Sequence, residues 1–220
     1  MHFERMADDY AASRPPYPKA LFDALTARGV IGPGVRVLEV GAGAGLATRA
    51  LVSSGSDVVA LEPGTDLATL LRRDVPGASV VLGRLEDASV PDGSSDAAVV
   101  ATSLHWVNLS IGLPRLHAAL RPSGWLAVWR TIFGDDTVET AFRDRVSHIA
   151  ADRRTDPGPS PRPLGRPTMG ELTSGRMFEP VHTERWRWSV DLTTDQVRRL
   201  FRTFSDWNDR EVEGSREGSR

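Results

Sequence analysis

The chain has 220 residues, a formal net charge of −2 at pH 7 and no cysteine. A chain of this length fits one domain that buries roughly 70% of the surface of its unfolded form, so it needs no metal or disulfide for stability. The composition excludes disulfides, Cys-ligated zinc and thiol nucleophiles, and the charge argues against a basic face for nucleic acid or an anionic membrane.

Short apolar runs alternate with helical patterns from the start of the chain to Thr131. Apolar runs bounded by Gly and Pro are typical of buried strands. Helices between such strands predict βαβ units and a parallel sheet with helices on both faces. The expected strands are residues 35–40, 57–63, 78–83, 95–103 and 124–131. The expected helices are residues 17–28, 46–55, 65–75 and 109–122.

The pattern changes after residue 131. Residues 135–154 predict an amphipathic helix, and residues 193–207 predict a second helix that begins at a Thr cap. The stretch 155–167 is so rich in Pro and Gly that we expect a loop. Residues 182–190 alternate between polar and apolar side chains, which favours a strand.

A glycine-rich turn follows the first expected strand, in "VLEVGAGAGLATRAL", Val37 to Leu51. A dinucleotide-binding turn needs Gly at its first, third and sixth positions, the last sometimes Ala. Counted from Gly41 the sixth residue is Leu46, and counted from Gly43 it is Thr48, so neither frame fits. This mismatch argues against a nicotinamide-dependent reductase.

The turn fits the pattern E-x-G-x-G-x-G, which begins at Glu39. Glycines let the backbone approach a ligand closely, and a carboxylate beside them can meet a cationic amino group. This combination suits S-adenosylmethionine, which has an amino group and a sulfonium but no phosphate. The ligand's own carboxylate can use the helix N-terminus that follows.

Three further markers follow in order. Glu62 ends the second expected strand, 21 residues after Gly41, where a carboxylate can accept both hydroxyls of a ribose. Rossmann oxidoreductases share that feature. Glu86, in "GRLEDASVPDGSSDAAVV", follows the third strand and is expected near the adenine edge. The segment "LRPSGWLAV" is a helix end and tight turn that leads into the fifth strand.

In this order the four markers resemble those of class I S-adenosylmethionine-dependent methyltransferases, in the small-molecule group that includes trans-aconitate methyltransferases. The similarity covers Phe3 to Arg130 well and the remainder loosely. It implies a single α/β domain over residues 1–220 with a mostly parallel, doubly wound, Rossmann-like sheet. It also implies S-adenosylmethionine as cofactor, S-adenosylhomocysteine as product and a small-molecule acceptor. By analogy, oxygen is favoured over nitrogen as the methylated atom.

The resemblance further implies where the site lies. The residues expected to bind the cofactor are Tyr10, Arg14, Tyr17, Glu39, Gly41, Ala42, Gly43, Glu62, Pro63, Leu85, Glu86, Thr102 and Ser103. The residues expected to border the acceptor are Leu104, His105 and Trp106. Residues 1–19 would fold over the cofactor as a lid, and residues 131–179, including the Pro-rich loop 155–167, would cap the acceptor pocket.

His105 is the candidate general base, because histidine titrates near neutral pH and can take a proton from a hydroxyl or amine. The alternative is a histidine that only packs or hydrogen-bonds at the pocket wall. Trp106 is either a packing residue or a cation–π partner for the sulfonium. The other histidines lack metal-ligand spacing and no carboxylate cluster is apparent, so we expect no metal.

One feature of the family has no counterpart here. Its sheet ends with an antiparallel seventh strand beside the sixth, yet no apolar run follows "FRTFSDWNDREVE". Either the sheet has six strands or a neighbouring chain supplies the pairing, which leaves a homodimer open. A non-catalytic protein that binds S-adenosylmethionine or a partner is the main alternative to an enzyme.

The location follows from what the sequence lacks. There is no run of about 18 apolar residues that would predict a transmembrane helix. The charged N-terminus lacks the apolar core of a signal peptide. We therefore expect a cytoplasmic protein.

Overall fold

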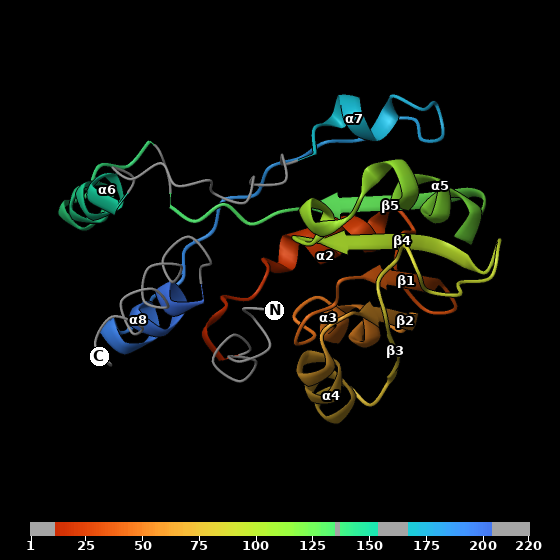
Figure 1. Cartoon of the computed structure of the whole chain (residues 1–220), viewed down its shortest axis with the longest axis horizontal. Helices are drawn as coiled ribbons and strands as arrows, with labels where there is room; N and C mark the ends of the chain where they lie inside the picture. Colours follow the sequence, from red (N-terminus) through yellow and green to blue (C-terminus); the bar gives the residue numbers. More distant parts are fainter. Residues whose placement is uncertain (1–11, 135–136, 154–166, 204–220) are drawn as a thin grey trace, which may run out of the picture.

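The computed structural model describes residues 12–134, 137–153 and 167–203. Within these residues five strands form one sheet in the order β3-β2-β1-β4-β5, and every neighbouring pair is parallel (Figure 1). The strands are β1 (Arg36–Val40), β2 (Asp57–Glu62), β3 (Ala78–Leu82), β4 (Ser95–Ala101) and β5 (Leu120–Trp129). The order reverses between β1 and β4, the point at which open α/β sheets bind ligands. The predicted doubly wound sheet is confirmed.

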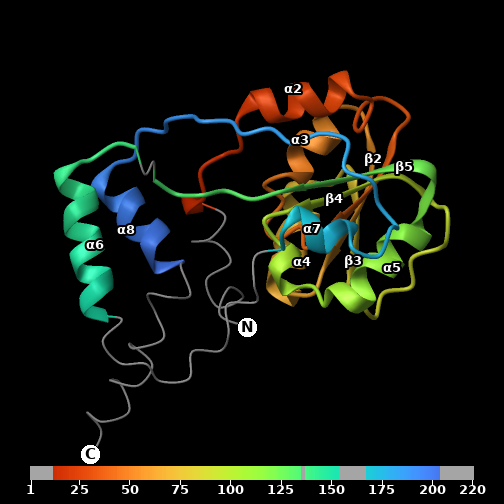
Figure 2. The ribbon, with the colours of Figure 1, turned by 90° about the horizontal axis from the view of Figure 1, so that it is seen from above.

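Helices cover both faces of the sheet. The first face carries α2 (Lys19–Ala27), α3 (Thr48–Ser53) and α4 (Thr65–Asp74), and the second carries α5 (Leu109–Ala119) and α7 (Met169–Thr173). Figure 2 shows α2 and α3 on one side of the strands and α5 and α7 on the other. With both faces covered, the inner strands are buried along most of their length without alternation, as expected for parallel sheets.

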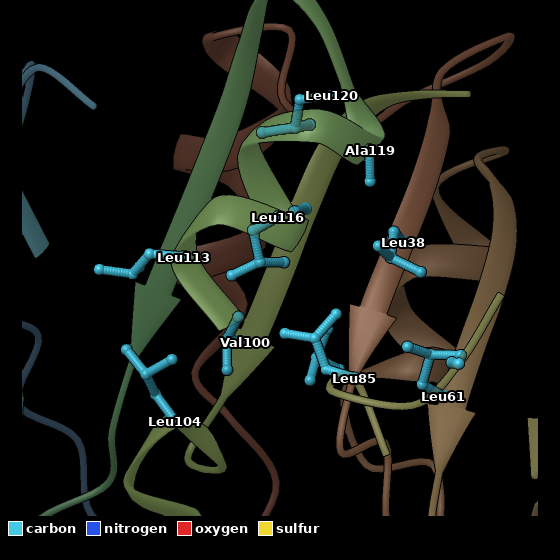
Figure 3. Packing of buried hydrophobic residues seen from close by; sticks show 12 residues of the cluster. Leu38, Leu61, Leu85, Val100, Leu104, Leu113, Leu116, Ala119 and Leu120 are labelled. Carbon is cyan, nitrogen blue, oxygen red and sulfur yellow. The ribbon is translucent and has the colours of Figure 1, made fainter. Parts of the chain in front are cut away.

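The core on the second face joins α5 to the central strands. Leu113 and Leu116 of α5 belong to one apolar cluster with side chains of β1 and β4, and Leu85 from the β3–β4 connection lies beside Leu61 and Val100 (Figure 3). Burying a side chain of this size stabilises the fold by roughly 1.5–3 kcal/mol. The short connection 83–90 is therefore anchored by its apolar residues.

Two helices lie apart from the sheet. α6 (Ala141–Arg153) and α8 (Thr194–Arg202) lie next to each other in both views (Figures 1 and 2). Phe142 of α6 and Phe201 of α8 meet edge to face with ring centroids 6.4 Å apart. α8 begins with a capping box formed by Thr193 and Gln196, which explains why the predicted start is confirmed.

The predicted strand over residues 182–190 is wrong. These residues belong to no strand of the structure, and nearly all of their side chains are exposed. Among the described residues, β5 also has no strand on the side that faces away from β4. An alternating pattern becomes a strand only when a neighbour takes up its backbone hydrogen bonds, so the pattern alone was insufficient.

The remaining differences concern element ends. The sequence predicted that the fifth strand begins at residue 124. In the structure α5 ends at Ala119 and β5 follows directly from Leu120. The short helices α7 and η2 (Leu104–Trp106) were not predicted.

No helix among the described residues is both long and apolar enough to cross a membrane.

Candidate functional site

The candidate site lies where the carboxyl ends of β1, β2 and β4 meet. After β1 the backbone turns over the end of β2, because the N–H groups of Gly41 and Ala42 both donate to Leu61 O, at 2.9 and 3.1 Å. Gly41 and Gly43 have φ values of +69° and +59°, which side-chain-bearing residues rarely adopt. The glycines of the sequence motif thus form a bend that leaves the backbone open to close approach.

Glu62 holds this bend to the start of α4. Its Oε2 accepts from the Gly43 N–H at 2.7 Å, and its Oε1 accepts from the Gly64 N–H at 2.8 Å. The side chain is buried, with Pro63 next to it in the turn between β2 and α4. A carboxylate oxygen has two lone pairs and can accept more than one hydrogen bond.

Glu39 has a different environment on the neighbouring strand. It is 1% exposed, and the strand register places it between Ala60 of β2 and Val99 of β4, which are both fully buried. Neither carboxylate oxygen has a hydrogen-bond partner among the described residues. Burial, with a smaller contribution from the charge of Glu62, raises the pKa of Glu39 to about 8 against the lowering effect of the Thr48 hydroxyl. The carboxyl is therefore largely protonated at neutral pH.

The chain after β4 is bent sharply at Thr102. Thr102 has φ +60°, an outlier for a β-branched residue of the kind that clusters at functional sites. Its N–H donates to Trp129 O at 2.8 Å, which fixes the bend to the end of β5. The next residue, Ser103, donates from Oγ to Val40 O at 2.5 Å. A Cβ on Gly41 would lie only 2.6 Å from Ser103 Cβ. The ends of β1 and β4 are thus in close contact here.

Tyr17 reaches the same bend from the N-terminal segment. Its hydroxyl lies 3.1 Å from Thr102 Oγ1, and its ring packs edge to face on Trp129, with centroids 5.6 Å apart. Arg14 is directed elsewhere. It donates to Thr203 O at 3.3 Å, beyond the end of α8, and lies over the Phe133 ring at 5.5 Å. Arg14 therefore links the N-terminal segment to the chain that follows β5.

The two residues expected near adenine have structural contacts of their own. Leu85 is 2% exposed and its side chain belongs to the core. Glu86 Oε1 accepts from the Asn108 N–H at 2.8 Å, ahead of α5, and its Oε2 lies 3.8 Å from Arg84 Nε. Glu86 thus ties the β3–β4 connection to the segment after β4.

The residues expected at the acceptor lie on the 3-10 helix η2. Leu104 is buried in the core, His105 is half-buried and Trp106 is 49% exposed. The rings of His105 and Trp106 lie 4.8 Å apart. The structure therefore places an imidazole and an indole just beyond the Thr102 bend, and Tyr10 lies outside the described residues.

Two residues near the glycines were missed by sequence reasoning. Thr48 is fully buried in the first turn of α3, and its hydroxyl has no partner among the described residues. Arg49 donates from Nη1 to the carbonyl oxygens of Ala44 and Gly45, at 3.2 and 3.3 Å, and from Nη2 to Asp74 at 3.4 Å. Their position in the first turn of the helix after the glycines is a signal that could have indicated them. Among the described residues no group of three or more His, Asp or Glu side chains is placed to hold a metal ion.

Comparisons with known proteins agree with this geometry. A family model described as a methyltransferase domain matches residues 38–128, from β1 to β5. A solved structure from Anaeromyxobacter dehalogenans, assigned as a type II methyltransferase, is similar with a TM-score of 0.53 and 29% identity. It covers 67% of this chain and 68% of that one. Residues 38–128 carry a methyltransferase domain, and the sheet has the Rossmann-like fold of class I S-adenosylmethionine-dependent methyltransferases.

Two relatives show how far the similarity extends. An uncharacterized methyltransferase of Mycobacterium tuberculosis is 38% identical over 123 residues, which are 56% of this chain and 49% of that protein. A methyltransferase-like protein of Schizosaccharomyces pombe is 29% identical over 205 residues, 92% of this chain and 77% of that protein. The chain spans about half the length of the first curated relatives that it matches. The narrower resemblance to trans-aconitate methyltransferases is not confirmed by these relatives.

Proposed function

We propose that this methyltransferase chain transfers a methyl group from S-adenosylmethionine to a small-molecule acceptor. The observation that carries the proposal is the arrangement at the switch point. There the glycine bend, held by Glu62, lies beside the Thr102 bend at the carboxyl ends of neighbouring strands. Ligands of open α/β sheets bind in this position.

The residues present fit the cofactor. The bend has no side chain at Gly41 or Gly43, so a ligand can lie against the backbone. Glu62 places a carboxylate, the group that accepts hydrogen bonds from ribose hydroxyls, at this bend, and Glu39 supplies a buried carboxyl two residues before it. Bound S-adenosylmethionine would supply a methyl group on a sulfonium, which the acceptor displaces in line at carbon.

The chain's own contribution would be alignment and exclusion of water. Positioning an acceptor against a reactive carbon is worth about 7–11 kcal/mol. Tyr17 and Trp129 hold the Thr102 bend from two sides, so the residues of η2 have a defined direction. We propose that the N-terminal segment closes over the cofactor and that residues 131–179 cap the acceptor pocket.

The acceptor and the proton transfer are the finer part of the proposal. His105 is half-buried beside the bend, where an imidazole can accept a proton from a hydroxyl or amine as the methyl transfers. Oxygen is favoured over nitrogen by analogy alone. We also propose that no metal takes part and that the protein acts in the cytoplasm on a free small molecule rather than on nucleic acid or a membrane.

In the part of the chain that the structure describes, no strand pairs with the outer edge of β5. A neighbouring chain that pairs with this edge would make a homodimer, and light scattering coupled to size exclusion distinguishes it from a monomer. A protein that binds the cofactor without turnover is the second candidate function.

Thermal unfolding with added ligands tests the proposal. S-adenosylmethionine, S-adenosylhomocysteine and NADH are each added at about 100-fold the expected dissociation constant, where a true ligand stabilises the fold by roughly 2.7 kcal/mol. We expect the melting temperature to rise with the two sulfur compounds and to stay unchanged with NADH. No rise with either sulfur compound would overturn the cofactor assignment, and with it the methyltransferase activity.

A further inference from the structure

Glu39 and Thr48 are neighbouring buried polar residues whose side-chain oxygens make no hydrogen bond, within the described residues, that would stabilise the fold. Both carboxylate oxygens of Glu39 and the Thr48 hydroxyl oxygen are buried without a hydrogen-bond partner among the described residues. The two strands beside Glu39 contribute Ala60 and Val99, which offer no polar side chain. An ionised carboxylate in such surroundings costs several kcal/mol, whereas a protonated one avoids most of that cost.

The charged groups around Glu39 give it no counter-ion in the described structure. From β2, Glu62 acts on it as a like charge. From α3, Arg49 is directed to the glycine-bend carbonyls and to Asp74 of α4, and Asp74 is also bound to Arg73. From α2, the charged residues Lys19 and Asp23 pair with each other at the exposed surface. The described residues therefore supply no counter-ion to Glu39, whereas a cationic ligand can.

The glycine bend offers the route by which a ligand can act on Glu39. The bend begins two residues after Glu39, and its positive φ values at Gly41 and Gly43 let a ligand lie close to the backbone. S-adenosylmethionine has two cationic groups, the ammonium and the sulfonium. A positive charge within about 4–6 Å lowers the pKa of a carboxyl by 1–3 units.

We propose that Glu39 holds a proton in the ligand-free protein and releases it to the solvent when the cationic cofactor binds beside the glycine bend. The O–H bond of the carboxyl breaks, the proton passes to water or buffer, and the carboxylate remains to balance the charge of the ligand. This inference rests on the proposed function, because it requires S-adenosylmethionine to be the ligand.

The size of the effect follows from the starting pKa of about 8. If binding lowers the pKa of Glu39 by about two units, about 0.8 proton leaves per ligand bound at pH 7. With the same two-unit change in pKa, the affinity for the cofactor rises about 25-fold between pH 6 and pH 8. A group that stays protonated in the complex would give neither effect.

Isothermal titration calorimetry in buffers of different ionisation enthalpy measures the protons released. The full chain is titrated with S-adenosylmethionine at pH 7, and the heat is plotted against the buffer enthalpy. We expect a slope near 0.8 proton for the native protein and near zero for Glu39→Gln. The neutral thioether 5′-methylthioadenosine should release no proton from either protein, because it has no ammonium or sulfonium.

A matched control is Asp57→Asn. Asp57 lies at the opposite end of β2, and its side chain is 60% exposed in a pair with Arg36. This variant removes one carboxyl from the same sheet and should keep the native slope. The quantity compared is the difference in slope between the native protein and Glu39→Gln, about 0.8 proton, which reports the carboxyl apart from protons exchanged elsewhere.

Each outcome separates this inference from the proposed function. S-adenosylmethionine that binds with the same proton slope in the native protein and in Glu39→Gln overturns the inference and leaves the cofactor assignment standing. If S-adenosylmethionine does not bind the native protein at all, the proposed function fails first. Should Glu39→Gln not fold, infrared difference spectra of the native protein decide. Loss of the protonated carboxyl C=O band on ligand addition supports the inference, and an unchanged band overturns it.

Discussion

Replacing Gly41 by Ala should destabilise the protein more than the same change at a glycine whose added Cβ would meet no other atom. Gly41 has φ +69°, and an L-residue in that region costs about 1–2 kcal/mol. The added Cβ would lie 2.6 Å from Ser103 Cβ and 2.9 Å from its Oγ. Ser103 would have to move and strain its bond to Val40 O, which adds about 1–3 kcal/mol. We expect a total loss of about 2–5 kcal/mol.

The control is Gly34→Ala in the turn before β1. Gly34 has φ +79°, yet nothing lies within 4 Å of the position of its Cβ, so only the backbone strain applies. Urea unfolding followed by circular dichroism gives the free energy of unfolding of both variants. Replacing Ser103 by Gly in the Gly41→Ala background removes the contact and should reduce the effect of Gly41→Ala to that of Gly34→Ala. Equal losses for the two single alanine variants would refute the close approach of β1 and β4.

Three further predictions concern single polar groups. Glu39→Gln should stabilise the protein by about 3 kcal/mol at pH 7, as measured by urea unfolding from pH 5 to 8.5. The Glu39 carboxyl titrates with a pKa near 8 in the folded form and 4.5 in the unfolded form, so between these pH values only the folded form keeps the proton. The free energy of unfolding of the native protein therefore falls by about 1.36 kcal/mol per pH unit in this window. Glu39→Gln has no carboxyl at this position and should lack that slope. Tyr17→Phe should cost about 0.5–1.5 kcal/mol of unfolding free energy by removing the hydroxyl contact with Thr102, and Thr102→Ser should keep most of it. His105→Ala should lower turnover by roughly 10²–10⁴-fold with little change in cofactor affinity, and equal turnover would exclude His105 as a base.

The sheet and the glycine bend could be predicted because their signals are local. Apolar runs separated by helical patterns are enough to indicate a parallel sheet, and the positions of Gly41 and Glu62 follow from the strand ends. Residues 182–190 show the limit of such reasoning. Their alternation is also local, but a strand needs a partner from another part of the chain, which no local pattern reports. The link from Arg14 to Thr203 joins residues 189 positions apart and was unpredictable for the same reason.

The direction of the Glu39 side chain could not be predicted from the sequence, for a different reason. In a strand with one buried face, alternation shows the direction of each side chain. β1 is buried on both faces from Val37 to Val40, so its burial shows no alternation and Glu39 is flanked by apolar residues on both sides. Only the structure shows that Glu39 shares a face with Val37 and lies against Thr48 of α3, whereas Leu38 and Val40 belong to the other core.

Two carboxyl groups at the ends of adjacent strands therefore have opposite environments. Glu62 has a backbone N–H for each oxygen, whereas Glu39 has none among the described residues. Divergent environments of paired titratable groups are typical of functional sites. Folding alone gives no reason for an acid that costs the protein about 3 kcal/mol at neutral pH. A ligand cation does give one, because it stabilises the carboxylate only in the complex. The two effects of Glu39→Gln should therefore have opposite signs, a more stable fold and weaker cofactor binding, as expected where stability is traded for function.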